Sequence, residues 1–134
     1  MLISDDEVRT MCRVVIAEDD FETRSLMRLA LRHMSCHILE VGSGLELLEA
    51  IAYDGPFDLI VTDIAMPHID GVRVIAMARN AGVNTPILVV SAHVPEDTTA
   101  AWLGEVKILR KPFGLQALRQ AVTSLLEVEA PTTA

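Results

Sequence analysis

Polar side chains stand at the ends of four of the five apolar runs in this sequence, where those runs give way to loops. In chain order they are Glu18 and Asp19, Asp63, Ser91 and Lys111. Carboxylates that crowd together repel, and each raises the pKa of the others unless a cation lies among them. Mg²⁺ suits such a group, because it takes oxygen ligands, keeps several waters and accepts a phosphate as a further ligand.

A carboxylate beside such a cation can attack phosphorus and form an acyl phosphate. The Lys111 ammonium and the Ser91 hydroxyl would then bind the phosphoryl oxygens. Taken alone, each residue has a plainer interpretation. Lys111 would be a surface lysine, while Asp20 and Asp70 precede helical segments and are expected to be helix caps. The order of the polar residues along the chain, each at the end of its own run, favours a shared site.

The elements that must position these residues alternate along the chain. Short apolar runs predict strands at 13–17, 36–41, 57–62, 86–91 and 106–110, and helical periodicity predicts helices at 21–34, 43–52, 71–79, 95–103 and 115–128. Strict alternation predicts an α/β fold with a five-stranded parallel sheet and helices on both faces. Side chains at the carboxyl ends of parallel strands lie along one edge of the sheet, where such folds place their chemistry.

Length and composition agree with one domain. The chain has 134 residues, of which 51% are hydrophobic, and a net charge of −8. This charge argues against general affinity for nucleic acids or anionic membranes. Neither a membrane span nor a basic signal-peptide start is present, so we expect a cytoplasmic protein. We predict a lead-in at 1–12, one domain at 13–128 and a tail or linker start at 129–134, with Cys12 and Cys36 as free thiols.

Four segments carry a resemblance to the receiver domain of two-component response regulators, and it extends over about residues 13–128. They are "VVIAEDD", "DLIVTDIAMPHIDG", "PILVVSA" and "LRKPF". The first resembles the opening strand and acidic pair of the family, and the second resembles its phosphoacceptor segment. The third matches a strand that ends in Ser or Thr followed by Ala, and the fourth matches a Lys-Pro-Phe segment.

The resemblance implies a role for each matched residue. Asp63 would be the phosphorylated aspartate, with Ser91 and Lys111 binding the phosphoryl group. The Mg²⁺ ligands would be Glu18, Asp19, Asp63 and the backbone carbonyl of Ala65. The Lys111–Pro112 peptide bond would be cis, which aims the lysine at the phosphoryl group.

It also implies a fold and partners. The strand order would be 2-1-3-4-5, as in flavodoxin-like folds. The phosphoryl donor would be a histidine kinase or a histidine phosphotransfer protein, and an unknown output protein or domain would receive the signal. The domain would be regulatory rather than an enzyme, would contact neither nucleic acid nor membrane directly, and would be a monomer or a weak homodimer.

The sequence departs from the common pattern of the family at three places. His68 stands where glycine is common, and Ile108 stands where many receivers carry Tyr or Phe. The segment between Ser91 and Lys111 is about two residues shorter than the common pattern. In receivers with Tyr or Phe at this position, the aromatic ring turns inward on phosphorylation, and isoleucine cannot make the same movement. We therefore predict that activation moves Ser91 and the loop through His93 more than it moves Ile108.

Two other classes of protein are weighed against this interpretation. A small phosphatase resembling the haloacid dehalogenases also uses a strand-end aspartate, but it needs a second Asp two residues later, where Ala65 stands. A binding module that keeps only the fold would not need the full set of five polar residues. We therefore favour a phosphorylation-dependent switch.

Overall fold

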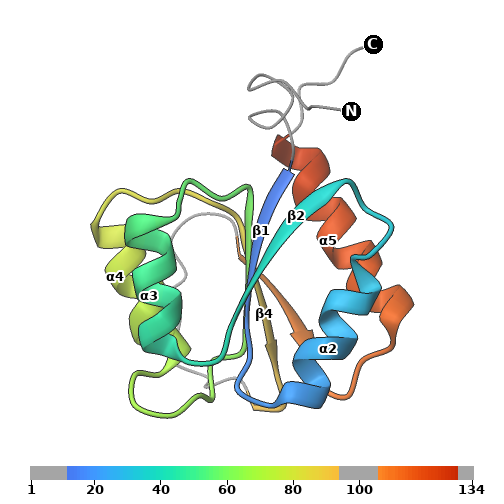
Figure 1. Ribbon diagram of the computed structural model, residues 1–134, viewed down its shortest axis with the longest axis horizontal. Coiled ribbons are helices and arrows are strands. Elements are labelled where there is room, and N and C mark those ends of the chain that lie inside the picture. The colour runs from blue at the N-terminus through green and yellow to red at the C-terminus, as the bar shows by residue number, and fades with distance from the viewer. Residues whose placement is uncertain (1–11, 94–105, 130–134) are drawn as a thin grey trace, which may run out of the picture.

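The computed structural model describes residues 12–93 and 106–129, which form a parallel five-stranded sheet between two layers of helices (Figure 1). The strands are β1 (Cys12–Ala17), β2 (Cys36–Val41), β3 (Leu59–Thr62), β4 (Ile87–Ser91) and β5 (Val106–Arg110). All neighbouring pairs are parallel, and the order across the sheet is β2-β1-β3-β4-β5. The predicted fold class and strand order are confirmed.

Within residues 12–93 and 106–129, four helices cover the two faces of the sheet. They are α2 (Phe21–Ala30), α3 (Gly44–Tyr53), α4 (Gly71–Asn80) and α5 (Leu115–Glu129). One apolar layer joins the sheet to α2 and α5, and the other joins it to α3 and α4. The predicted helix at 95–103 lies outside the described residues. No helix in the described part of the chain has the length and apolar character needed to cross a membrane.

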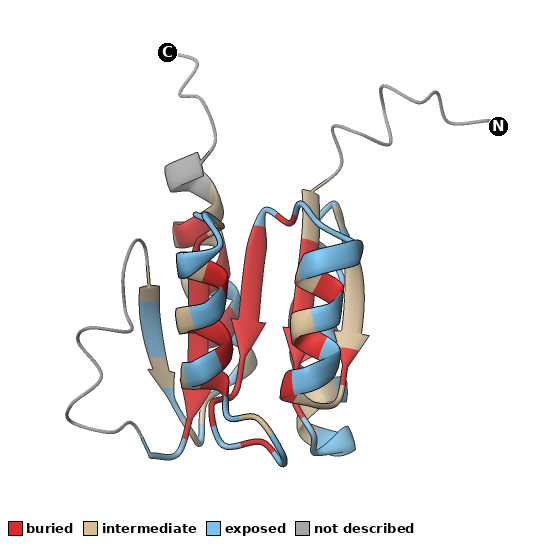
Figure 2. Ribbon diagram, turned by 90° about the vertical axis from the view of Figure 1, so that its left-hand side faces the viewer, coloured by how far each residue is buried: buried red, intermediate tan, exposed pale blue. Residues whose placement is uncertain are grey.

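Burial explains why the central strands read as unbroken apolar runs. Every residue of β3 and β4 is buried, whereas the edge strands β2 and β5 consist of half-buried and exposed residues, apart from the buried Val41 at the end of β2 (Figure 2). A central strand of a parallel sheet is covered by helices on both faces, so both sets of its side chains must be apolar. Polar side chains are therefore free to occur only where these strands end.

Side-chain caps start three of the helices where the sequence predicts them. Asp20 accepts a 3.0 Å hydrogen bond from the Thr23 N–H at the start of α2. Asp70 caps α4 in the same manner, accepting from the Arg73 N–H at 2.9 Å. Ser43 caps α3. Such caps stabilise the first turn by satisfying an N–H group that has no partner within the helix, and the expectation that Asp20 and Asp70 are caps is confirmed.

Apart from the end of α2, the predicted boundaries of the described elements lie within two residues of those in the structure. The helix predicted at 21–34 ends at Ala30, because the next N–H groups bond three residues back instead of four, as in Arg32 N–H to the Leu29 carbonyl at 3.2 Å. The strand predicted from Pro86 begins at Ile87. Proline has no N–H to give to a ladder, although its carbonyl accepts from the Ile60 N–H.

Candidate functional site

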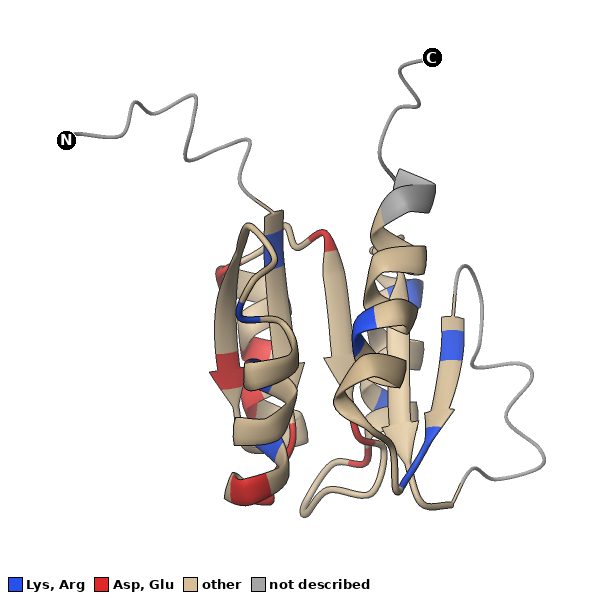
Figure 3. Cartoon of the chain, turned by 90° about the vertical axis from the view of Figure 1, so that its right-hand side faces the viewer, with Lys and Arg blue, Asp and Glu red and all other residues tan. Residues whose placement is uncertain are grey.

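The carboxyl ends of the strands bring three of the predicted acidic residues together. Glu18, Asp19 and Asp63 each offer a carboxylate oxygen, and these oxygens all lie within 4.8 Å of one another. Glu18 and Asp63 are buried, while Asp19 is exposed. Acidic residues lie close to the arrowheads of the central strands in Figure 3, and a basic segment leaves β5 beside them. The predicted convergence on one edge is confirmed for these residues.

Lys111 bridges two of these carboxylates. Its Nζ lies 2.5 Å from Glu18 Oε1 and 2.6 Å from Asp63 Oδ2. Burial by itself lowers the pKa of Lys111, but its hydrogen bonds to Asp63 and Glu18 outweigh this effect and raise the pKa. Its backbone N–H donates to the Ser91 carbonyl at 3.0 Å, and the Lys111–Pro112 peptide bond is cis, as predicted. The lysine therefore lies inside the acidic group as a charged ammonium.

Glu18 is the most deeply buried of the three acids, with 1% of its surface exposed. Burial raises its pKa, and the hydrogen bond and charge of Lys111 oppose that rise. Its backbone N–H donates to the Val41 carbonyl at 3.1 Å, so the strand pairing of β1 with β2 continues into the acidic loop. A carboxylate at this depth requires a compensating cation, and Lys111 supplies one.

Asp63 is held at both its backbone and its side chain. Its N–H donates to the Ala17 carbonyl at 3.0 Å, and Oδ1 accepts a 2.9 Å hydrogen bond from the Ala65 N–H. Gly71, at the start of α4, packs directly beneath it. A Cβ on Gly71 would lie 2.6 Å from the Asp63 carbonyl oxygen, so only glycine allows α4 to approach this closely.

Ser91 and Ala65 reach this edge with their polar atoms in other roles. The Ser91 side chain is buried, and its Oγ donates to the His93 carbonyl at 3.0 Å. Ala65 uses its N–H on Asp63, and the expected role of its carbonyl as a metal ligand stays a prediction. His68, in the loop between Asp63 and α4, has φ +71°, a region that glycine adopts far more easily. This accounts for the glycine common at that position in the resembled family.

The donor set fits Mg²⁺. Three carboxylates from two strand ends give oxygen atoms at close range, and one of them is exposed to solvent and to an approaching ligand. Mg²⁺ is commonly held by few carboxylates together with waters and phosphate oxygens. A cation bound at Glu18, Asp19 and Asp63 would offset the repulsion that Lys111 relieves only in part.

Arg24, which no pattern in the sequence singles out, contacts the backbone of the acidic loop. Its Nη1 donates to the Glu18 carbonyl at 2.7 Å. In the sequence, Arg24 is one of several arginines in an amphipathic helix, four residues after Asp20. That spacing indicates an ordinary helix-surface pair. Its contact with Glu18 arises only when α2 packs against the sheet.

Relatives among known proteins share most of this chain. The family described as the response regulator receiver domain matches residues 14–123. Response regulator MprA of Mycobacterium leprae (strain TN) is 33% identical over 124 residues, which are 91% of this chain and 54% of that protein. MprA of Mycobacterium tuberculosis (strain ATCC 25618 / H37Rv) gives the same values. The chain thus spans about half the length of these curated relatives.

Solved structures of receiver proteins also match this chain. A response regulator receiver protein from Sinorhizobium medicae WSM419 has a TM-score of 0.80 and 26% identity, covering 91% of this chain and 99% of that one. The signal receiver domain of the putative response regulator NarL from Mycobacterium tuberculosis has a TM-score of 0.75 and 28% identity, covering 87% and 97%. The chain therefore belongs to the response regulator receiver domain family, a family of two-component signalling.

Proposed function

We propose that Asp63 accepts a phosphoryl group from a histidine kinase or a histidine phosphotransfer protein, in the presence of Mg²⁺, and that this changes the surface that an output partner contacts. The observation that carries the proposal is the position of Lys111, whose Nζ lies within 2.6 Å of both Glu18 and Asp63 carboxylates. A cation placed against a strand-end carboxylate and an acidic pair suits the charge that phosphoryl transfer develops.

In the proposed reaction, an Asp63 carboxylate oxygen attacks phosphorus while the bond from phosphorus to the donor's imidazole nitrogen breaks. The electron pair of that bond stays on the imidazole, and the phosphoryl group becomes an acyl phosphate. Lys111 moves its hydrogen bonds onto phosphoryl oxygens, and the Ser91 hydroxyl supplies another once it leaves the His93 carbonyl. Glu18, Asp19, Asp63 and the Ala65 carbonyl would hold Mg²⁺, which would supply positive charge next to the transferred group.

The phosphatase alternative has less support. It needs a second carboxylate two residues after the nucleophile, and Ala65 occupies that position with only its N–H directed at Asp63. A binding module without phosphorylation would leave the Glu18–Lys111–Asp63 group unexplained, since a buried ion pair is often no more stabilising than well-packed apolar residues in its place. We therefore retain the regulatory function and propose that the domain is not a turnover enzyme.

The partners follow from the same proposal. The curated relatives are about twice as long as the matched region, so we propose that residues 13–128 form the receiver and pass the signal to a separate output domain or protein. We propose that this domain makes no direct contact with nucleic acid or membrane. The association state that we propose is a monomer or a weak homodimer.

The number of phosphoryl groups that each chain takes up tests this function. Wild-type protein would be incubated with acetyl phosphate and Mg²⁺, and its intact mass would be measured over time. We expect one phosphoryl group per chain, an uptake that chelation of the metal abolishes, and negligible turnover of p-nitrophenyl phosphate. Continuous release of p-nitrophenol, without a stable phosphorylated species, would support the phosphatase alternative instead.

A further inference from the structure

The Arg24 side chain makes three contacts next to the acidic loop. Its Nη1 lies 2.7 Å from the Glu18 carbonyl oxygen, and its Nε lies 3.5 Å from Glu40 Oε1 on β2. Its guanidinium carbon stands 5.6 Å from the centre of the Phe21 ring. With 20% of its side chain exposed, it is more confined than Arg28, the other arginine of α2, which is 67% exposed. The guanidinium therefore has a defined position against the backbone of the acidic loop.

The carbonyl that Arg24 holds belongs to the peptide that joins Glu18 to Asp19. The orientation of that peptide determines the direction in which the two carboxylates leave the backbone. The Glu18 N–H is already fixed by the Val41 carbonyl at 3.1 Å, and Arg24 fixes the other side of the residue. Together they hold the acidic pair where its oxygens lie within 4.8 Å of an oxygen of Asp63.

We propose that Arg24 is a positioning residue for the divalent-cation site, acting through the Glu18 carbonyl and without touching the cation or the phosphoryl group. This inference rests on the function proposed above. Groups that orient the ligands of a metal commonly affect its affinity strongly. The guanidinium suits this task because its planar fork reaches a carbonyl and a carboxylate at once, which a lysine ammonium does not do in the same way.

The direction in which Mg²⁺ affinity changes when Arg24 is removed distinguishes a positioning role from a purely electrostatic one. A positive charge near a cation site repels the cation, so a purely electrostatic Arg24 would weaken Mg²⁺ binding and its removal would strengthen it. A positioning Arg24 has the opposite consequence, because its removal releases the peptide that aims both carboxylates.

The test compares Arg24→Met with Arg28→Met. Arg28 lies 3.0 Å from the same Glu40 carboxylate, but it is 67% exposed and is therefore the matched control. Mg²⁺ affinity would be measured by titration calorimetry without any phosphodonor, and folding by circular dichroism and urea unfolding. We expect Arg24→Met to bind Mg²⁺ roughly tenfold more weakly than wild type, and Arg28→Met to bind it as wild type does.

Equal or tighter Mg²⁺ binding by folded Arg24→Met would overturn the inference. If Arg24→Met does not fold, Arg24→Lys decides the question, because it keeps the charge and loses the fork. Weaker binding by Arg24→Lys supports positioning, and wild-type affinity overturns it. Failure of the wild type itself to bind Mg²⁺ would instead overturn the proposed function, so the two failures are distinguishable.

Discussion

At the scale of single residues, the site is a balance of charge in which Lys111 has the central place. It lies between two buried carboxylates, those of Glu18 and Asp63. Burial raises the pKa of Glu18, and the paired carboxylates raise the pKa of Lys111 against the opposing effect of its own burial. Removing the charge of Lys111 should therefore have a large effect on the stability of the metal-free protein.

Replacing Lys111 with Met should destabilise the metal-free protein. The change leaves Glu18 and Asp63 buried without a cation, and we expect a loss of about 2 kcal/mol in the free energy of unfolding, since Lys111 is partly exposed. Urea unfolding at about pH 8 without metal measures this. Lys107→Met, which removes an exposed lysine of β5, is the control. Equal stability of Lys111→Met and wild type would contradict the charge balance described here.

Glu18 predicts a specific dependence on pH. Because its folded pKa is raised, the folded state holds this proton more tightly than the unfolded state does. That contribution is fully present below the unfolded pKa of about 4.5 and is lost as the pH rises through the folded value. Glu18→Gln cannot ionise, so its stability relative to metal-free wild type should increase as the pH rises above 4.5. A difference between the two that stays constant with pH would refute this.

At the scale of elements, the close approach of α4 to β3 depends on Gly71. An added Cβ would meet two backbone atoms, the Asp63 oxygen at 2.6 Å and Ile64 Cα at 2.7 Å. Backbone atoms cannot move aside as flexible side chains can, so Gly71→Ala should cost about 2 kcal/mol of stability. Gly114→Ala is the matched control, because no heavy atom lies within 4 Å of a Cβ there. Thermal unfolding in which both variants match wild type would contradict this packing.

Most of the elements could be predicted from the sequence, because the period of apolar residues changes from strand to helix at each boundary. The end of α2 could not, because Leu31 and Met34 continue the apolar stripe and pack in the core while the backbone has already changed its hydrogen bonding. The acidic group and Lys111 were predictable from their places after the strands. The direction of the Ser91 hydroxyl and the contact made by Arg24 depend on tertiary packing, which no local pattern encodes.

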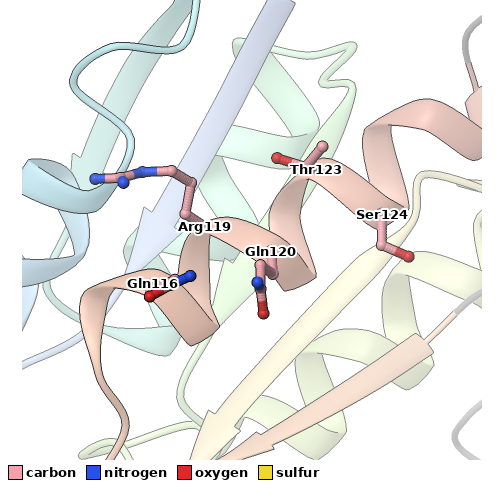
Figure 4. Close-up of a pocket in the computed structure, with 5 residues that line it drawn as sticks. All are labelled: Gln116, Arg119, Gln120, Thr123 and Ser124. Carbon is pink, nitrogen blue, oxygen red and sulfur yellow. The ribbon is translucent and has the colours of Figure 1, made fainter.

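At the scale of the whole molecule, the face formed by α5 and β5 is where we would expect a second copy to bind if the domain forms the weak homodimer, one of the two proposed association states. A hollow on α5 has a volume of about 420 Å³. Its lining residues, drawn in Figure 4, are Gln116, Arg119, Gln120, Thr123 and Ser124. Arg119 Nε donates to the Ala30 carbonyl at 3.0 Å, and Lys107 Nζ lies 2.6 Å from Ser124 Oγ. Two cationic side chains of this face, Lys107 and Arg119, are thus engaged in hydrogen bonds within the chain. This argues for the monomer over the dimer.

The central claim is that Asp63 is the phosphoacceptor, and intact mass after treatment with acetyl phosphate and Mg²⁺ tests it most directly. Three proteins would be compared: wild type, Asp63→Asn and the control Asp58→Asn, which changes an exposed aspartate near the other end of β3. An amide is a poor nucleophile, so we predict one added phosphoryl group on wild type and Asp58→Asn, and none on Asp63→Asn. One full equivalent on Asp63→Asn would contradict the account, because the nucleophile would then lie elsewhere.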